Sequence, residues 1–148
     1  MKAIYTRINK EGDLKKYEQQ LKSCRAYVED EGDVLYFHDV ASGNADNAPG
    51  LTALLEAVST GAISQVIVSS IDRFSLQYGV VRKVVDKLHH FGATVFATDM
   101  EKEIVDDGLL IMYFAFQEFL HQERSKSIKE GVARAKERRE QQSISNQV

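Results

Sequence analysis

SQVIVSSIDRFS, residues 64–75, is the segment that decides the fold predicted for this chain. It contains the β-branched run Val66-Ile67-Val68, which is typical of a strand buried on both faces of a parallel sheet. Asp72 and Arg73 follow at the predicted end of that strand, at the edge where open α/β sheets form their binding sites. A carboxylate beside a guanidinium suits phosphate recognition, although a surface ion pair that caps the strand is the simpler interpretation.

Strand and helix patterns alternate on both sides of this segment. Further strands are predicted where β-rich residues cluster, at residues 3–8, 34–38 and 94–98. Helices are predicted where apolar residues recur at spacings of three and four, at residues 13–30, 49–61 and 80–90. The apolar face of the first helix would include Leu14 and Val28. This order predicts an α/β fold with a mostly parallel sheet of four or five strands flanked by helices.

The composition limits the class of protein. The chain has 148 residues, 43% of them hydrophobic, and a formal net charge of −3, which argues against a surface coated with nucleic-acid-binding charge. Cys24 is the single cysteine and no Cys/His spacing resembles a zinc site, so we expect no disulfide framework, metal or cofactor. With no signal peptide and no bilayer-spanning run in the sequence, we expect a cytoplasmic protein without a membrane partner.

The last third of the sequence predicts one long helix. From Asp106 to about Glu140 there is no proline, which allows a helix of roughly 34 residues, or about 50 Å. We therefore divide the chain into an α/β domain at 1–104, a long helix at 105–142 and a tail at 143–148, with no helix-turn-helix domain after it. Residues 109–116 are apolar around the whole predicted helix, so the surplus face needs a second partner, and a dimer through this helix is expected.

The second half of the long helix is basic. Between Gln122 and Glu140 the net charge is +3, which leaves −6 for the rest of the chain. A basic projecting helix suits weak, sequence-independent contact with DNA phosphates, although a solvated helix with interleaved charges is an equal alternative. The candidate DNA contacts are Arg124, Lys126, Arg134, Lys136, Arg138 and Arg139.

Three segments, in this order and at these separations, resemble the motifs of the serine recombinases, the family of resolvases and DNA invertases. The segments are Tyr5-Thr6-Arg7-Ile8-Asn9, Asp39-Val40-Ala41-Ser42-Gly43 with Ala48-Pro49-Gly50-Leu51, and Asp72-Arg73-Phe74-Ser75. The resemblance covers essentially the whole catalytic domain of that family, including the long helix. It implies a DNA-recombination function, a serine nucleophile and arginines that clamp the scissile phosphate.

The residues that the resemblance assigns to the catalytic site are only partly those of the family. Retained positions are Arg7, Asp39, Ser42, Asp72 and Arg73. Asn9 occupies the position of the nucleophilic serine, while Ala48 and Leu76 replace two arginines of the family motifs. An amide cannot be activated as a nucleophile, so the resemblance implies a degenerate active site.

Three hypotheses follow from the sequence. The first is a recombination-linked protein that cannot cleave DNA and acts through oligomerisation, DNA contact or an active recombinase as partner. The second is an active recombinase in which another hydroxyl, such as Thr6 or Ser42, replaces the missing serine. The third is an α/β interaction module without a DNA role, in which Asp39, Asp72 and Arg73 form structural ion pairs.

Overall fold

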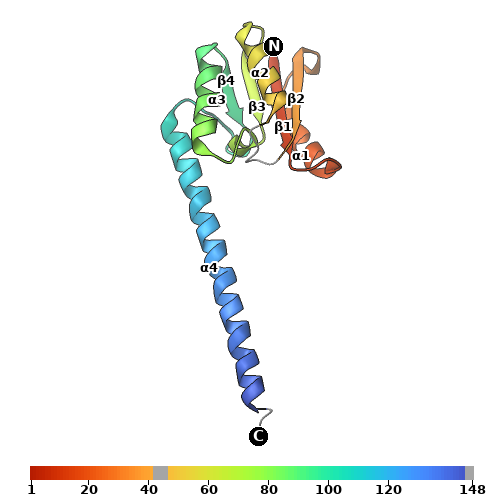
Figure 1. Cartoon of the computed structure of the whole chain (residues 1–148). Helices are drawn as coiled ribbons and strands as arrows, with labels where there is room; N and C mark the ends of the chain where they lie inside the picture. The colour runs from red at the N-terminus through yellow and green to blue at the C-terminus, as the bar shows by residue number, and fades with distance from the viewer. Residues whose placement is uncertain (42–46, 146–148) are drawn as a thin grey trace. The chain divides into compact units, whose positions relative to one another are not determined.

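A five-stranded sheet with the strand order β2-β1-β3-β4-β5 forms the centre of the fold (Figure 1). The computed structural model describes residues 1–41 and 47–145, and the side chains of these as far as residue 143. The strands are β1 Lys2–Ile8, β2 Val34–Val40, β3 Gln65–Val68, β4 Thr94–Ala97 and β5 Lys102–Glu103. The first four pair in parallel and β5 pairs antiparallel to β4, which confirms the predicted α/β fold.

Helices cover both faces of this sheet. They are α1 Leu14–Arg25, α2 Pro49–Ser59 and α3 Tyr78–His90, with short 3-10 turns η1 Glu31–Asp33 and η2 Ile71–Arg73. On one face, Cys24 of α1 packs with Ile4 and Ile67 in a fully buried cluster. The neighbouring residue Tyr5 points to the opposite face, because side chains alternate along a strand, and α2 and α3 pack there.

The end of α1 and the position of β5 differ from the sequence prediction. Helix α1 ends at Arg25, five residues before the end predicted at residue 30, because Tyr27 and Val28 donate backbone hydrogen bonds three residues back and tighten the last turn. Val28 still packs against the buried cluster, whereas Leu14 is 65% exposed and does not belong to the apolar face. Strand β5 was not predicted, because two residues are too few to show a pattern.

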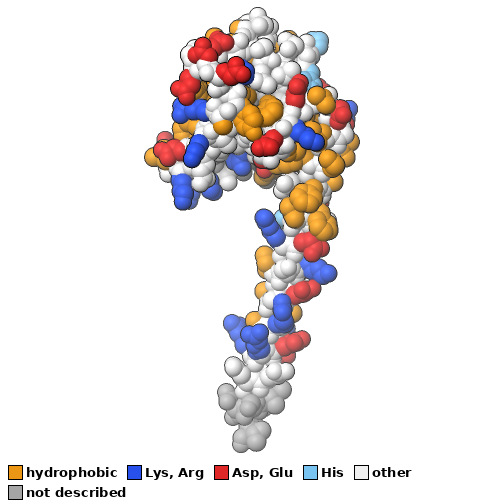
Figure 2. Space-filling view, turned by 180° about the vertical axis from the view of Figure 1, so that it is seen from behind, with side chains coloured by type: hydrophobic (Ala, Val, Ile, Leu, Met, Phe, Trp, Pro, Cys, Tyr) orange, Lys and Arg blue, Asp and Glu red, His pale blue; other side chains and the backbone are white. Residues whose placement is uncertain are grey.

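The long helix predicted for the last third is present as α4, Asp107–Ser145. The chain divides into two compact units, residues 1–110 and 111–148, and α4 supplies nearly all of the second. Large apolar side chains lie exposed in its first half, and Figure 2 shows them gathered there, with charged side chains of both signs further along. Among the described residues, no helix has the length and apolar character needed to cross a membrane.

Candidate functional site

The carboxyl edge of strands β1, β2 and β3 brings together most of the residues assigned to the site. The parallel register places Arg7 of β1 directly beside Asp39 of β2. Asp72 and Arg73 lie in the η2 turn that follows β3, because Ser69 and Ser70 end that strand. The sheet therefore collects these four side chains at one edge, as parallel sheets do. Ser42 lies outside the described residues.

Arg7 is buried and its side chain is held by the main chain. Its Nε donates to the carbonyl oxygen of Ala41 at 3.2 Å and its Nη1 to that of Phe74 at 3.1 Å, and only 3% of the residue is exposed. Its own backbone is paired with the side-chain amide of Gln20, which accepts from the Arg7 N–H at 3.0 Å and donates to the Arg7 carbonyl at 2.9 Å. Arg7 thus connects β1, α1 and the segments after β2 and β3.

Asp39 is also buried, and its carboxylate accepts hydrogen bonds from groups far apart in the sequence. Tyr5 donates its hydroxyl at 2.6 Å, and the backbone N–H groups of Gly50 and Leu51 donate at 2.7 and 2.8 Å. Ala48, the residue before α2, offers no side-chain cap, so Asp39 supplies the missing negative acceptor to the first turn of that helix. Burial raises the pKa of the Tyr5 hydroxyl, and the hydrogen bond to Asp39 raises it further.

The first turn of α2 approaches β2 so closely that residue 50 must be glycine. A Cβ atom at Gly50 would lie 2.3 Å from the carbonyl oxygen of His38 and 2.9 Å from the Asp39 carboxylate. Both distances are shorter than the contacts that Cβ atoms make in protein structures. The Pro-Gly-Leu motif at the start of α2 therefore has a packing reason that is independent of any chemistry.

Arg73 is the partly exposed cation of the edge. Its Nη1 donates to the carbonyl oxygen of Arg7 at 3.2 Å and its Nε to the Ser70 hydroxyl at 3.3 Å. The Asp72 carboxylate lies 3.5 Å from the same Nε and accepts a hydrogen bond from Ser70. Asp72 and Arg73 are each about one third exposed or less.

Three positions carry no group suited to strand cleavage. Asn9, at the position where the resemblance implies a serine, follows β1 and is exposed, and its side chain ends in an amide. Leu76 is 53% exposed and Ala48 is half-buried, and neither side chain can donate to a phosphate. Among the residues that the structure describes, no group of three or more His, Cys, Asp or Glu side chains could hold a metal ion.

Not every residue that lies at this edge was identified from the sequence. A groove of about 250 Å³ separates α1 from the end of β3 and is lined by Lys16, Gln19, Gln20, Ser23, Ser69 and Arg73. The polar residues of α1 in this group recur at spacings of three and one, which places them on one face of the helix. This spacing is the sequence pattern from which the groove could have been predicted. Asp99 was also missed: its N–H donates to Ser69 at 3.0 Å, and burial together with the nearby charge of Asp72 raises its pKa.

The candidate DNA contacts lie on α4 and are all exposed. They are Arg124, Lys126, Arg134, Lys136, Arg138 and Arg139. Arg134 donates its Nε to the carbonyl oxygen of Glu130 one turn earlier, at 3.3 Å. These side chains belong to the second unit of the chain, whereas the edge residues belong to the first.

Comparisons with known proteins agree with this architecture. The N-terminal catalytic domain of TP901-1 integrase is similar at a TM-score of 0.64 and 18% identity, over 84% of this chain and 98% of that one. A resolvase family site-specific recombinase from Streptococcus pneumoniae is similar at a TM-score of 0.58 and 16% identity, over 91% of this chain and 97% of that one. At these identities the likeness shows the fold alone. No curated protein sequence matches the chain.

A match to a family model shows the family of the chain, which the structural likeness alone does not show. The model described as "Resolvase, N terminal domain" matches residues 2–141, nearly the whole chain. The same span contains the edge residues and most of α4. The chain therefore belongs to this resolvase family.

Proposed function

We propose that this protein is linked to site-specific DNA recombination, does not cleave DNA, and acts through oligomerisation and contact with DNA or with an active recombinase. Membership of the resolvase family supports the link to recombination. The observation that carries the loss of cleavage is Asn9, an exposed amide at the nucleophile position. We further propose a cytoplasmic location.

The surroundings of Asn9 support the same conclusion. A phosphoryl transfer needs positive charge at the developing pentacovalent phosphate, and Ala48 and Leu76 provide none. Of the retained arginines, Arg7 is 3% exposed and donates to two carbonyl oxygens. Its guanidinium is therefore engaged in hydrogen bonds within the fold. Of the two retained arginines, Arg73 is the one with a partly exposed side chain.

Thr6 does not suit the role of a substitute nucleophile. It is 1% exposed, its hydroxyl oxygen lies 2.7 Å from Nδ1 of His38, and it points to the face of β1 opposite Arg7. Detection of a covalent protein–DNA adduct would nevertheless favour an active recombinase. Complete absence of DNA binding and of recombination partners would favour an interaction module without a DNA role.

We propose two roles for the long helix, predicted at residues 105–142, and the first is self-association. Ile111, Met112, Phe116 and Phe119 are between 52% and 63% exposed, which a stable monomer would rarely leave uncovered on one helix. We expect a dimer at micromolar concentration, with Phe114 and Leu120 among the further contacts. Sedimentation velocity should show it, and Phe116→Glu should shift the population to monomer. A wild-type protein that remains monomeric would exclude this role.

The second role is contact with DNA phosphates. Binding should be weak, indifferent to sequence and lost between about 50 and 200 mM salt, because the basic end of α4 offers charge without groups placed to read bases. Changing Arg134, Lys136, Arg138 and Arg139 together to Glu should abolish the shift of a duplex in fluorescence anisotropy. Sequence-selective binding by the wild-type chain would contradict this expectation.

A further inference from the structure

A row of small and apolar side chains follows the C-terminal half of α4. Ser125, Ile128, Val132 and Ala135 are separated by three, four and three residues, so they share one face of the helix. Ile128 is 67% exposed and Val132 is 65% exposed. We call these four residues the α4 seam. Their spacing is that of the core positions of a coiled coil.

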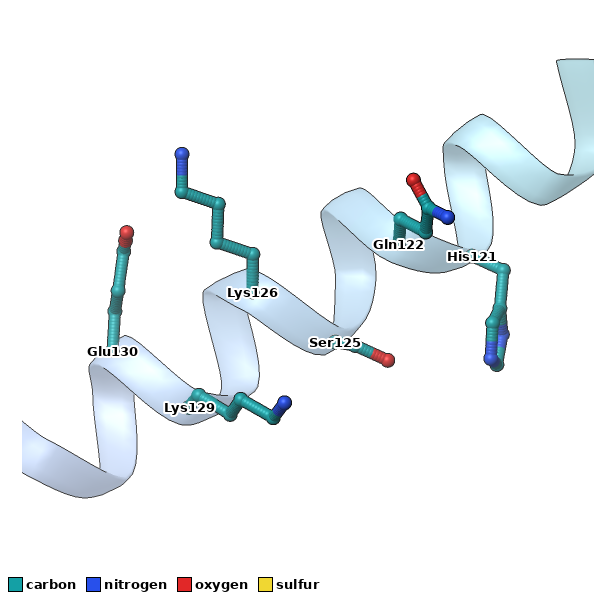
Figure 3. Close-up of a pocket in the computed structure, with 6 residues that line it drawn as sticks. All are labelled: His121, Gln122, Ser125, Lys126, Lys129 and Glu130. Carbon is teal, nitrogen blue, oxygen red and sulfur yellow. The ribbon is translucent and has the colours of Figure 1, made fainter.

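Both flanks of the α4 seam are basic. Arg124 and Arg138 lie along one side and Lys129 and Lys136 along the other, at the positions that border the core of a coiled coil. Figure 3 shows Ser125 and Lys129 on one side of the helix, with Glu130 projecting away from them. The acidic residues Glu123, Glu130 and Glu137 recur every seven residues and therefore form a separate row on the opposite side.

This arrangement disfavours pairing of the seam with a second copy of itself. Two such helices would place Arg and Lys opposite Arg and Lys in the parallel and in the antiparallel orientation alike, because both flanks carry the same sign. A helix with Glu or Asp beside its apolar stripe would instead meet opposite charge along both flanks. It would also cover Ile128 and Val132, which lie about two thirds exposed.

From this charge complementarity we propose that the α4 seam is a docking surface for an acidic amphipathic helix of another protein. The inference goes beyond the proposed function, because it adds a protein partner distinct from DNA and from a second copy. The partner would bind Arg124, Lys136 and Arg138, which are also candidate DNA contacts. Occupation of the seam would therefore exclude DNA from this part of α4, and the partner would act as an antagonist of DNA binding.

DNA and an acidic helix make different demands on the surface. Phosphates require only the cations, so the apolar side chains of the seam contribute nothing to DNA affinity. A docked helix requires the cations and the seam together, because the apolar contacts provide its register. Substitutions that shorten Ile128 and Val132 without a change of charge therefore separate the two partners.

The test uses the full chain and two fluorescent synthetic peptides of about three heptads, each with Leu at the core positions. One peptide carries Glu at the flanking positions and the other carries Lys. We expect the Glu peptide to bind, the Lys peptide to bind at least about tenfold more weakly, and a DNA duplex to displace the Glu peptide. Failure of the Glu peptide to bind, or equal binding of both peptides, would overturn the proposal.

The variant for this test is Ile128→Ala with Val132→Ala, which keeps the charge and favours the helix. It should weaken binding of the Glu peptide about tenfold and leave the affinity for DNA unchanged. Ser127→Ala is the matched control outside the seam and should change neither, while circular dichroism checks that α4 stays helical. No loss of peptide binding would show that the surface recognises charge alone, and an equal loss of DNA binding would show that the apolar side chains do not separate the two partners; either result would contradict the proposal.

Discussion

Replacement of Asp39 by alanine should lower the free energy of unfolding by about 4 kcal/mol, because three buried or partly buried donors lose their acceptor at once. The Tyr5 hydroxyl and the N–H groups of Gly50 and Leu51 all donate to this carboxylate. An unsatisfied buried donor costs about 1 to 3 kcal/mol, and the start of α2 loses its cap as well. Asp39→Asn should cost less, because one oxygen remains.

Urea denaturation followed by circular dichroism measures this loss. Asp86→Ala is the matched control, since Asp86 is 70% exposed and its ion pair with Arg82 spans 3.9 Å. The control should shift the free energy of unfolding by less than about 0.5 kcal/mol. If Asp39→Ala were as stable as the control, the conclusion that the fold uses this motif residue would be wrong.

The substitution Gly50→Ala should destabilise the protein by about 3 kcal/mol, because the added carbon meets main-chain atoms that cannot rotate away. The Cβ would lie 2.3 Å from the His38 carbonyl oxygen and 2.8 Å from its carbon. Relief of that overlap requires α2 to move from β2, which lengthens the hydrogen bond from the Gly50 N–H to Asp39, 2.7 Å in the native structure. The effect is therefore steric and electrostatic together.

Gly79 provides the control for this substitution. It lies in α3, and a Cβ there would have no atom within 4 Å. Gly79→Ala should leave thermal stability unchanged or raise it by up to about 1 kcal/mol, because alanine favours the helix. Equal melting temperatures for Gly50→Ala and Gly79→Ala would mean that the close approach of α2 to β2 does not constrain residue 50.

These two sites give residues of the family motifs a structural role that does not depend on catalysis. Asp39 caps α2, Gly50 allows its approach, and Arg7 joins three segments through its guanidinium. Each of these residues would be retained for stability even if no phosphate ever entered the edge. Asn9, Ala48 and Leu76, the positions that we propose serve chemistry alone, are the ones where the sequence departs from the motifs that the resemblance implies.

Much of the fold could be predicted because its signals are local. The run Val66–Val68 identified a buried strand, and the apolar spacing from residue 80 onward identified α3. The end of α1 was missed because the apolar spacing continues to Val28 after the helix has ended, and Val28 still reaches the core. The spacing of apolar residues indicates which side chains are buried, but it does not indicate which backbone conformation places them in the core.

The location of the site was predictable, and its bonding was not. Parallel strands bring their carboxyl ends to one edge, so Arg7, Asp39 and Arg73 could be expected together. That Arg7 donates to the carbonyl oxygens of Ala41 and Phe74 depends on the three-dimensional path of two connecting segments. For the same reason, the contribution of Ser69 to the groove beside α1 could not be deduced from the sequence.

The most direct test of the central claim is a search for a covalent link between this protein and DNA. The wild-type chain would be incubated with supercoiled DNA that carries sites from its own genetic neighbourhood, denatured with detergent and analysed by gel and by intact mass. The account predicts free protein of unchanged mass and unbroken DNA, because Asn9 offers no oxygen nucleophile and Ala48 and Leu76 offer no charge to the phosphate. A protein–DNA adduct that survives denaturation, at whatever residue it maps, would contradict it.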